Sequence, residues 1–368
     1  MTKIGIGIIG GGYMGKAHAV AMSSVGAIFN TALRPHLAMV AATTDASAAR
    51  YRDAYGFDEG TGDWRKLVES SAVEAVVIAS VQSTHREITE AAAALGKPVL
   101  CEKPLGASLE DARAMTEAVE RAGIANMVGF NYSRTPATQY ARKLIASGAI
   151  GDVTYYRGEH TEDFFADPDE IATWRIHGRP NGTMGDLAPH PINQALALIG
   201  PIREVMAEIT TVHATRPGPD GPQTVTNDDQ ATVLLRFEGG VSGQIFTSRT
   251  AMGRKMGYAY DVYGTKGAIR FDGEDQNALW LYQNTGEAAQ RGFTKILTGP
   301  EHPDYLPFCQ GPGHGTGYQD QITIEAKDFL LAIETGAAIW PTFRDGLAVS
   351  EVVEASWRSH EAGTWAKV

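Results

Sequence analysis

Apolar runs alternate with helix-like segments through the first third of the chain. The runs predict buried strands over residues 4–9, 39–44, 75–80, 99–101 and 127–130. Helical patterns lie between them, over residues 16–24, 46–55, 84–95 and 108–121, and Asp63 opens a further short helix. Strands that are separated by helices are typical of βαβ units, in which helices cover both faces of a parallel sheet. We therefore predict a doubly wound, parallel α/β domain over residues 1–130.

The pattern changes near Asn131, where strand-like segments begin to follow one another directly. These segments are residues 153–157, 231–237, 241–248, 258–263 and 279–282, and amphipathic helices are predicted over 319–335 and 346–361. Consecutive strands without crossover helices form antiparallel sheets. We predict a second, α+β domain over residues 131–368, with Pro- and Gly-rich loops at 216–222 and 300–317.

Composition and charge narrow the class of partner. Of 368 residues, 43% are hydrophobic and 20% are charged, which is ordinary for globular domains with cores. The chain has 43 acidic and 32 basic side chains, a net charge of −11, so a surface that binds a nucleic-acid backbone is not expected. No apolar run approaches the roughly 18 residues of a membrane helix, and glycines and Lys16 break the N-terminal run that an export signal would need.

The two cysteines, Cys101 and Cys309, lie far apart in the sequence. There is no Cys-x-x-Cys pair and no His-Glu-x-x-His motif. We therefore expect no disulfide framework and no bound metal, and a reducing cytoplasm is the expected compartment.

A glycine-rich loop joins the first predicted strand to the first predicted helix. Gly10, Gly12 and Gly15 form G-x-G-x-x-G in the context in which this motif is informative. The first glycine permits the tight turn, the second lets the backbone approach a pyrophosphate, and the third lets helix and strand pack closely. The amides at the helix N-terminus then face the anion, so the loop predicts a dinucleotide cofactor.

Asp45, after the second predicted strand, bears on which dinucleotide binds. A carboxylate there accepts hydrogen bonds from the ribose hydroxyls of NAD and repels the 2′-phosphate of NADP. Asp45 lies about 30 residues beyond Gly15 where about 20 is usual, so residues 25–35 are interpreted as an insertion. Asp45 could also cap the following helix, and the two roles are compatible. Because Arg50 could reach a 2′-phosphate, NAD is the predicted cofactor and NADP stays open.

Two further motifs carry a resemblance to a known family. Glu102-Lys103-Pro104 follows a short strand, and Asp186 and His190 stand four residues apart in the second half. Together with the glycine loop, they make the chain resemble the Gfo/Idh/MocA oxidoreductases, the group of glucose–fructose oxidoreductase and inositol dehydrogenase. The resemblance extends over nearly the whole chain, through residues 79–85, 131–136, 174–175 and 182–190. It implies an N-terminal Rossmann domain that binds NAD(P), a C-terminal α+β domain with a large open, mainly antiparallel sheet, and a cis peptide before Pro104 that orients Lys103.

The resemblance assigns catalysis to Lys103, Asp186 and His190, and the chemistry of alcohol oxidation supports the same roles. A secondary alcohol must lose a proton from oxygen while hydride leaves carbon, and a histidine is the side chain suited to take that proton. A carboxylate on the imidazole fixes its tautomer, which is the role of Asp186. An ammonium beside the oxygen stabilises the developing negative charge, which is the role of Lys103. Prolines flank His190, so a helix is predicted to start near Pro189 with Asp186 in the turn before it.

Other residues are assigned to the two ligands by their place in the resembling segments. The predicted cofactor contacts are Gly10, Gly12, Tyr13, Met14, Gly15, Asp45, Ser80, Gln82, His85, Glu102, Lys103, Trp174 and Arg175. The predicted substrate contacts are Lys103, Asn131, Tyr132, His160, Asp163, Asp186 and His190. Polar groups beside an aromatic side chain suit a polyhydroxylated ligand, although Trp174 could simply pack and Asp163 could cap a loop.

The leading hypothesis is an NAD-dependent dehydrogenase of a sugar, a sugar derivative or a cyclitol. One alternative is redox-neutral cleavage of a glycoside, in which some relatives oxidise a ring hydroxyl transiently and return the hydride. Another is a ligand-sensing regulator without activity, since a fold alone does not fix chemistry. Relatives commonly pair the open sheet face, so a homodimer or homotetramer is expected. No nucleic acid or membrane partner is expected.

Overall fold

The computed structural model describes all residues from 1 to 368 and divides into two compact units. The first unit comprises Met1–Arg134 and Gly317–Ala348, and the second comprises Thr135–Thr316 and Val349–Val368. The segment Gly317–Ala348 thus folds with the first unit, although the sequence boundary at residue 130 places it in the second. None of the helices combines the length and the apolar character that crossing a bilayer requires.

The first unit is built on a six-stranded parallel sheet. Its strands are β1 (Thr2–Ile9), β2 (Leu33–Ala41), β3 (Glu59–Thr61), β4 (Ala75–Ile78), β5 (Val99–Glu102) and β6 (Asn126–Gly129), in the order β3-β2-β1-β4-β5-β6. The strand order reverses between β1 and β4, and such a switch point is where doubly wound sheets bind ligands. Gly10 follows β1, Ser80 follows β4 and Lys103 follows β5, so these residues gather at the carboxyl ends of neighbouring strands.

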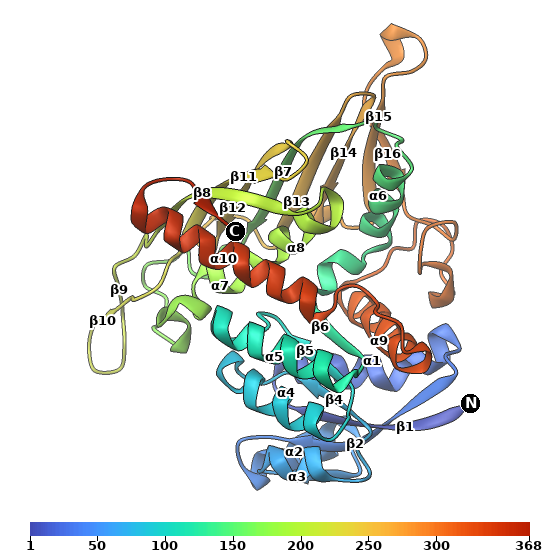
Figure 1. Ribbon diagram of the computed structural model, residues 1–368, viewed down its shortest axis with the longest axis vertical. Coiled ribbons are helices and arrows are strands. Elements are labelled where there is room, and N and C mark those ends of the chain that lie inside the picture. Colours follow the sequence, from blue (N-terminus) through green and yellow to red (C-terminus); the bar gives the residue numbers. More distant parts are fainter. The chain divides into compact units, whose positions relative to one another are not determined.

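Helices cover both faces of this sheet. They are α1 (Tyr13–Phe29), α2 (Asp45–Tyr55), α3 (Trp64–Glu69), α4 (His85–Ala94), α5 (Leu109–Ala122) and α9 (Tyr318–Thr335), with short 3₁₀ turns η1 (Gln82–Thr84) and η2 (Asn131–Arg134). Helices α1 and α9 share one apolar core with β1. This core includes Ile6 of β1 and Phe329 of α9. Helix α3 packs on the opposite face, where a methyl group on Gly7 would lie 2.6 Å from Leu67, and α4 and α5 lie side by side there (Figure 1).

The residues of the predicted insertion, 25–35, form regular structure. Residues up to Phe29 extend α1, and β2 begins at Leu33, so only a tight turn separates the two elements. Asn30 takes a left-handed conformation at the helix C-terminus, with φ of 50°, which is a conformation that asparagine tolerates well. The longer helix and strand explain why Asp45 lies so far beyond Gly15.

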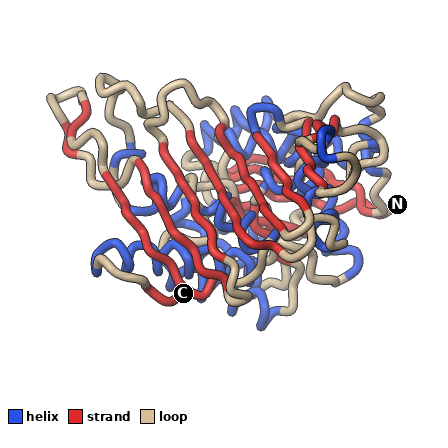
Figure 2. The backbone as a smooth tube through the Cα atoms, turned by 90° about the horizontal axis from the view of Figure 1, so that it is seen from above, coloured by secondary structure: helices blue, strands red, loops and turns tan.

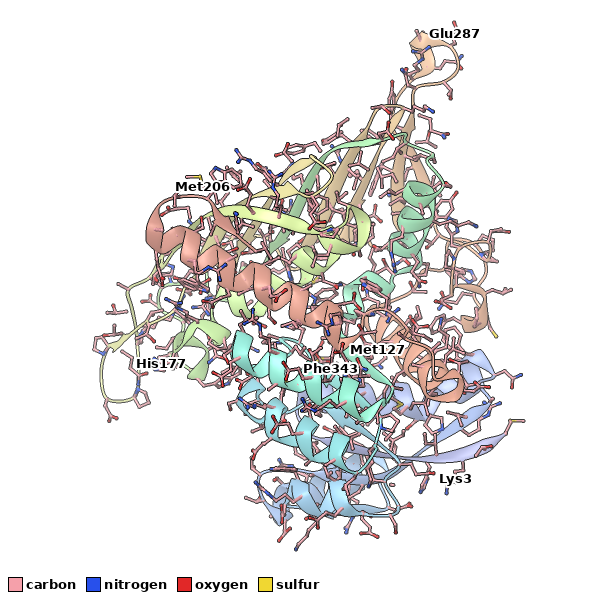
Figure 3. The ribbon with its side chains drawn as sticks, viewed as in Figure 1. Lys3, Met127, His177, Met206, Glu287 and Phe343 are labelled. Atoms are coloured by element: carbon pink, nitrogen blue, oxygen red, sulfur yellow. The ribbon has the colours of Figure 1, made fainter.

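The second unit contains a nine-stranded mixed sheet, seen face-on in Figure 2. Its strands are β7 (Val153–Thr161), β8 (Ile202–Thr210), β11 (Gln230–Phe237), β12 (Ser242–Ser248), β13 (Gly257–Gly264), β14 (Gly267–Asp272), β15 (Ala278–Gln283), β16 (Thr294–Leu297) and β17 (Ala366–Lys367). The order is β16-β15-β14-β13-β7-β12-β11-β8-β17, and β7 and β12 are its one parallel pair. A two-stranded ladder, β9 (Thr215–Arg216) with β10 (Gln223–Thr224), lies outside it. Glu287 marks the tip of the long connection between β15 and β16 (Figure 3).

Helices cover one face of this large sheet. They are α6 (Pro136–Ala146), α7 (Thr183–Asp186), α8 (Pro189–Leu198) and the last part of α10 (Phe343–Ala362), and the 3₁₀ turns η3 (Trp174–Ile176), η4 (Arg179–Asn181), η5 (Gly273–Asp275), η6 (Ala288–Gln290) and η7 (Leu306–Phe308) lie in the connections. The hydroxyl of Tyr156 donates to the Pro191 carbonyl, and that of Tyr260 meets the Thr138 hydroxyl, which ties the sheet to α8 and α6. Buried and exposed residues alternate along β8 and β11, so the opposite face is open.

Candidate active site

The glycine loop has the geometry that a dinucleotide requires. Gly10 has φ of +100°, and a methyl group there would lie 2.4 Å from the Ala79 carbonyl oxygen. A methyl group on Gly15 would lie 1.8 Å from the Gly10 carbonyl oxygen, so only glycine lets the loop and α1 approach so closely. At Gly12, the N-cap of α1, an added methyl group would meet nothing within 4 Å.

The N-terminus of α1 is consequently open. Gly12 has no side chain with which to cap the helix, and no acidic residue stands in the first turn. Tyr13 is 73% exposed and Met14 is half-buried. Uncapped amides and the positive end of the helix dipole form a site for an anion, which fits the pyrophosphate of a dinucleotide.

Asp45 is the first residue of α2, four residues beyond the end of β2. Thr44 is the N-cap, with its hydroxyl accepting from the Ser47 amide, so the alternative that Asp45 caps this helix is wrong. The Asp45 carboxylate instead accepts from the Gly62 amide at 2.6 Å and remains exposed. This bond joins α2 to the end of β3 and fixes the direction of the side chain.

The Lys103–Pro104 peptide is cis, as the resemblance implies. The buried ring of His85 lies against this turn, with one nitrogen 3.1 Å from the Pro104 carbonyl oxygen and the other 3.1 Å from the Ser80 carbonyl oxygen. Burial lowers the pKa of His85, so the neutral ring donates to one of the two carbonyl groups. His85, expected at the cofactor, therefore joins the segment after β4 to the segment after β5, beside the half-buried Gln82.

Three other residues assigned to the ligands are held by side chains of the first unit. Glu102 is buried, and its Oε1 lies 2.7 Å from Nε2 of His18. Asn131 is buried and donates to the side-chain oxygen of Gln321 at 3.0 Å. The ring of Tyr132 lies 6.1 Å from that of Tyr318, whose ring is in turn 5.9 Å from Tyr13.

In the second unit, Asp186 ends α7 and Pro189 begins α8. This confirms that Asp186 and His190 do not occupy one regular helix. His190 is buried, with 4% of its surface exposed, and its ring meets that of His160 edge-on at 5.3 Å. Tyr258 packs against both histidines and donates its hydroxyl to Gln194 of α8.

His160, assigned to the substrate, braces the turn that carries His190. Its Nδ1 lies 3.2 Å from the Leu187 carbonyl oxygen, which also accepts from the His190 amide. Its Nε2 lies 3.1 Å from a carboxylate oxygen of Glu162. The chain of contacts from Glu162 through His160 to Leu187 holds the start of α8 against β7.

The Asp186 carboxylate forms an ion pair with Arg175 at 2.9 Å. The guanidinium also lies 4.7 Å above the ring of Trp174, which is 57% exposed. The sequence assigned Trp174 and Arg175 to the cofactor, and the structure joins both of them to a predicted catalytic carboxylate. The Arg175 carbonyl is held in turn by Asn227 at 2.8 Å and Arg249 at 3.0 Å.

Asp228 anchors the helix that ends at Asp186. Its carboxylate accepts from the Met184 amide at 2.7 Å, and its carbonyl accepts from Thr183. Burial raises the pKa of Asp228 to about 6. Sequence analysis missed Asn227, Asp228 and Arg249, and the polar run at residues 226–229 after a loop was the only available signal.

Asp163, assigned to the substrate, lies in an ion pair on the surface. Both of its carboxylate oxygens accept from the Lys255 ammonium, the shorter contact being 2.7 Å. The hydrogen bond from Lys255 lowers the pKa of Asp163, and the Gly253 amide adds to this effect.

The fold and the glycine loop together define an oxidoreductase with an NAD-binding Rossmann domain. Residues 4–130 match the family model described as "Oxidoreductase family, NAD-binding Rossmann fold", and residues 138–270 match the GFO/IDH/MocA C-terminal domain. The chain belongs to the Gfo/Idh/MocA family of oxidoreductases.

Relatives with similarity over the full length act on sugars and cyclitols by name. The chain is 35% identical to levoglucosan dehydrogenase of Pseudarthrobacter phenanthrenivorans, over 100% of this chain and 99% of the relative. It is 31% identical to inositol 2-dehydrogenase of Rhizobium meliloti, over 96% of each chain. The solved structure of levoglucosan dehydrogenase in complex with NADH and levoglucosan superimposes with a TM-score of 0.96, at 35% identity and with 100% of each chain covered.

Proposed function

We propose that this protein is an NAD-dependent dehydrogenase that oxidises a secondary hydroxyl of a sugar, a sugar derivative or a cyclitol. The observation that carries the proposal is the buried His190 at the start of α8, one turn of chain after an Asp186 whose carboxylate is fixed by Arg175. Relatives named levoglucosan dehydrogenase and inositol 2-dehydrogenase, alike over the full length, support the substrate class.

His190 takes the proton of the reacting hydroxyl. The braced turn at Leu187 and the ring of Tyr258 limit the motion of its imidazole, which lowers the cost of holding the ring ready for proton transfer. Asp186 stabilises the imidazolium that forms, and Arg175 keeps this carboxylate in place. Trp174 stacks on Arg175 and so contributes to the same arrangement.

Lys103 stabilises the negative charge that develops on the substrate oxygen as its proton leaves. Glu102, the residue before Lys103, is hydrogen-bonded to His18, and the carbonyl of Pro104, the residue after it, is close to the ring of His85. The backbone on both sides of Lys103 is therefore held in place. Bound NAD would supply the acceptor for the hydride of the carbinol carbon. Gly10, Gly12 and Gly15 with the α1 amides of Tyr13 and Met14 would hold its pyrophosphate.

We propose NAD over NADP because Asp45 presents an exposed carboxylate beyond β2, where a 2′-phosphate would be repelled. Ser80 and Gln82 follow β4 at the same sheet edge and are proposed to contact the cofactor. Tyr132 and Asp163 are proposed to contact the substrate, whereas the buried Asn131 and His160 are proposed to act through their neighbours.

We also propose a homodimer or homotetramer formed through the open face of the large sheet. Met206 of β8 and Leu234 of β11 are register partners on this face, and they are 38% and 40% exposed. Apolar side chains gathered on an open sheet face favour association. The two cysteines are free thiols, which supports a reducing compartment, and we propose the cytoplasm.

The proposal is tested by following the absorbance of reduced nicotinamide with purified protein. The panel holds levoglucosan, L-sorbose, myo-inositol, scyllo-inositol, apiose and a set of glycosides, each with NAD and separately with NADP. Formation of NADH with a sugar or cyclitol is the expected result, with NADP weaker than NAD. Consumption of a glycoside without net NADH would contradict it and indicate redox-neutral cleavage, and ligand binding without turnover would indicate a sensor.

A further inference from the structure

One cluster of ionisable side chains in the first unit joins Glu102, which precedes Lys103, to His18 and to Glu325, a residue with no role in the mechanism above. His18 of α1, Glu102 at the end of β5 and Glu325 of α9 each direct one nitrogen or oxygen into a common space, and these atoms lie within 4.8 Å of one another. All three residues are buried, and His18 and Glu325 have no exposed surface. The three segments are far apart in the sequence, so this cluster forms only when α9 packs on α1.

Glu325 cannot be accommodated as an ordinary carboxylate. Neither of its carboxyl oxygens has a hydrogen-bond donor, whereas Glu102 accepts from His18 at 2.7 Å. A methyl group on Gly129 would lie 2.9 Å from the Glu102 carboxylate, so the backbone of β6 closes a further side. Two buried carboxylates with a single donor between them cannot both remain ionised, because each lacks solvation and repels the other.

The surrounding charges indicate which carboxyl group keeps the proton. Burial raises the pKa of Glu325 well above its usual range, the charge of Glu102 raises it further, and Asp328 adds to this while Arg134 opposes it. Arg134 is itself in an ion pair with Asp328, which also meets Lys327 at 3.0 Å.

The charge of Glu102 also raises the pKa values of its other titratable neighbours. Burial is the largest cause of the raised pKa of Cys101 and of Tyr318, and the Glu102 charge adds to both. Tyr132 and Tyr13 add further to the raised pKa of Tyr318. In His85 the Glu102 charge opposes the lowering that burial causes.

We propose that Glu325 is held as a neutral carboxylic acid whose proton is donated to Glu102, and that His18 and Glu325 together position Glu102 and the adjoining Lys103. A carboxylate that accepts hydrogen bonds from donors on two sides is fixed in place. Hydrogen bonds to a charged group are stronger than those between neutral groups. Glu325 and His18 are therefore positioning residues. The part of the inference that concerns Lys103 rests on the proposed function, whereas the protonation of Glu325 does not.

The proton is tested directly by infrared difference spectroscopy on the whole protein at about pH 8, where Asp228, with a pKa of about 6, is ionised and adds no band. A protonated carboxyl group has a carbonyl stretch distinct from the carboxylate bands, and it shifts in heavy water. This band is expected in the wild type and in Glu334→Gln, which changes an exposed residue of the same helix, and it is expected to be absent in Glu325→Gln. A wild type without the band, or a band that survives in Glu325→Gln, overturns the proposal. One equivalent of a divalent metal per chain that survives dialysis would also overturn it, because a cation would then neutralise the cluster.

The positioning role is tested by the steady-state kinetics of two variants. Glu325→Gln retains an N–H donor for Glu102 and should keep kcat within about threefold, whereas Glu325→Leu removes the donor and should lower kcat by about tenfold or more. KM for the sugar and the affinity for NAD should change little in both, because Glu325 has no exposed surface at which a ligand could contact it. Equal kcat values in Glu325→Leu and the wild type would overturn the positioning role. The infrared result requires no turnover, so it stands or falls separately from the proposed dehydrogenase activity.

Discussion

Gly12 and Gly15 are three residues apart, yet a methyl group would meet open space at Gly12 and a backbone carbonyl at Gly15. Gly15→Ala places a carbon 1.8 Å from the Gly10 carbonyl oxygen, so the loop must move and the free energy of unfolding should fall by about 1–3 kcal/mol. The methyl group of Gly12→Ala meets open space, and the residue has an ordinary φ of −72°. This substitution should change the free energy of unfolding by less than about 0.5 kcal/mol. Urea unfolding measures both values.

The same pair separates stability from cofactor binding. Gly12→Ala should still weaken NAD binding by about tenfold, because its methyl group stands where the pyrophosphate approaches the backbone. Calorimetric titration with NAD measures this loss. If Gly12→Ala bound NAD as the wild type does, the open N-terminus of α1 would not be the pyrophosphate site.

The role of a residue could be predicted from the sequence where it depends on neighbouring residues in the chain. It could not be predicted where it depends on a partner from another segment. The roles of Gly10 and Gly15 and the break between Asp186 and Pro189 follow from local sequence, whereas the cis peptide before Pro104 was implied by the family resemblance. Glu325 had no local signal, because its partners His18 and Glu102 lie more than 200 residues away. The pairing of Arg175 with Asp186 was missed for another reason, because the two residues lie in separate short helical turns whose relative placement has no local signal.

At the scale of elements, α9 belongs to the core of the first unit. Phe329 is fully buried in the core that α1 and β1 share, whereas Leu331 on the same helix is 42% exposed. Phe329→Ala should lower the free energy of unfolding by about 3–5 kcal/mol. Leu331→Ala is the matched control and should cost less than about 0.5 kcal/mol. Equal losses in chemical denaturation would show that α9 does not contribute to this core.

Asp228, which anchors α7, gives the protein a pH-dependent stability. Because burial raises its pKa from 3.8 to about 6, the folded state binds this proton more tightly than the unfolded state. The resulting stabilisation is present below the unfolded pKa and is lost as the pH rises through about 6. Relative to Asp228→Asn, which cannot ionise, the wild type should lose about 3 kcal/mol of unfolding free energy over this interval.

The measurement compares urea unfolding of the two proteins at about pH 4 and above pH 7. The exposed Asp220→Asn serves as the control and should show no such change. A difference between wild type and Asp228→Asn that stays constant with pH would mean that Asp228 is not buried as described.

Elements with a clear period were predicted well, and short or atypical ones were not. The parallel strands of the first unit are continuous apolar runs, and all of the predicted ones are present. Strands β8, β14 and β16 were missed because charged residues such as Arg203, Arg270 and Lys295 occupy their open face and interrupt the apolar pattern. The parallel pairing of β7 with β12 depends on strands over 80 residues apart, which no local pattern encodes.

At the scale of the whole molecule, the open face of the large sheet should control assembly. Leu234→Glu places a charge beside Met206 on this face and should reduce the mass in solution toward that of a monomer. Leu95→Glu, at an exposed leucine of the first unit, is the matched control and should leave the mass unchanged. Light scattering measures both, and a monomeric wild type would contradict the proposed interface.

The proposed mechanism depends above all on His190, which takes the proton from the reacting hydroxyl. The most direct measurement is the rate of NADH formation against pH in the wild type, in His190→Ala and in His213→Ala, which changes a histidine away from α8. We expect the wild type and His213→Ala to gain rate as the base loses its proton. In His190→Ala kcat should fall by about 10²–10⁴-fold, this rise should be absent, and added imidazole should restore part of the rate. A His190→Ala enzyme that keeps the wild-type rate and pH profile would contradict the account.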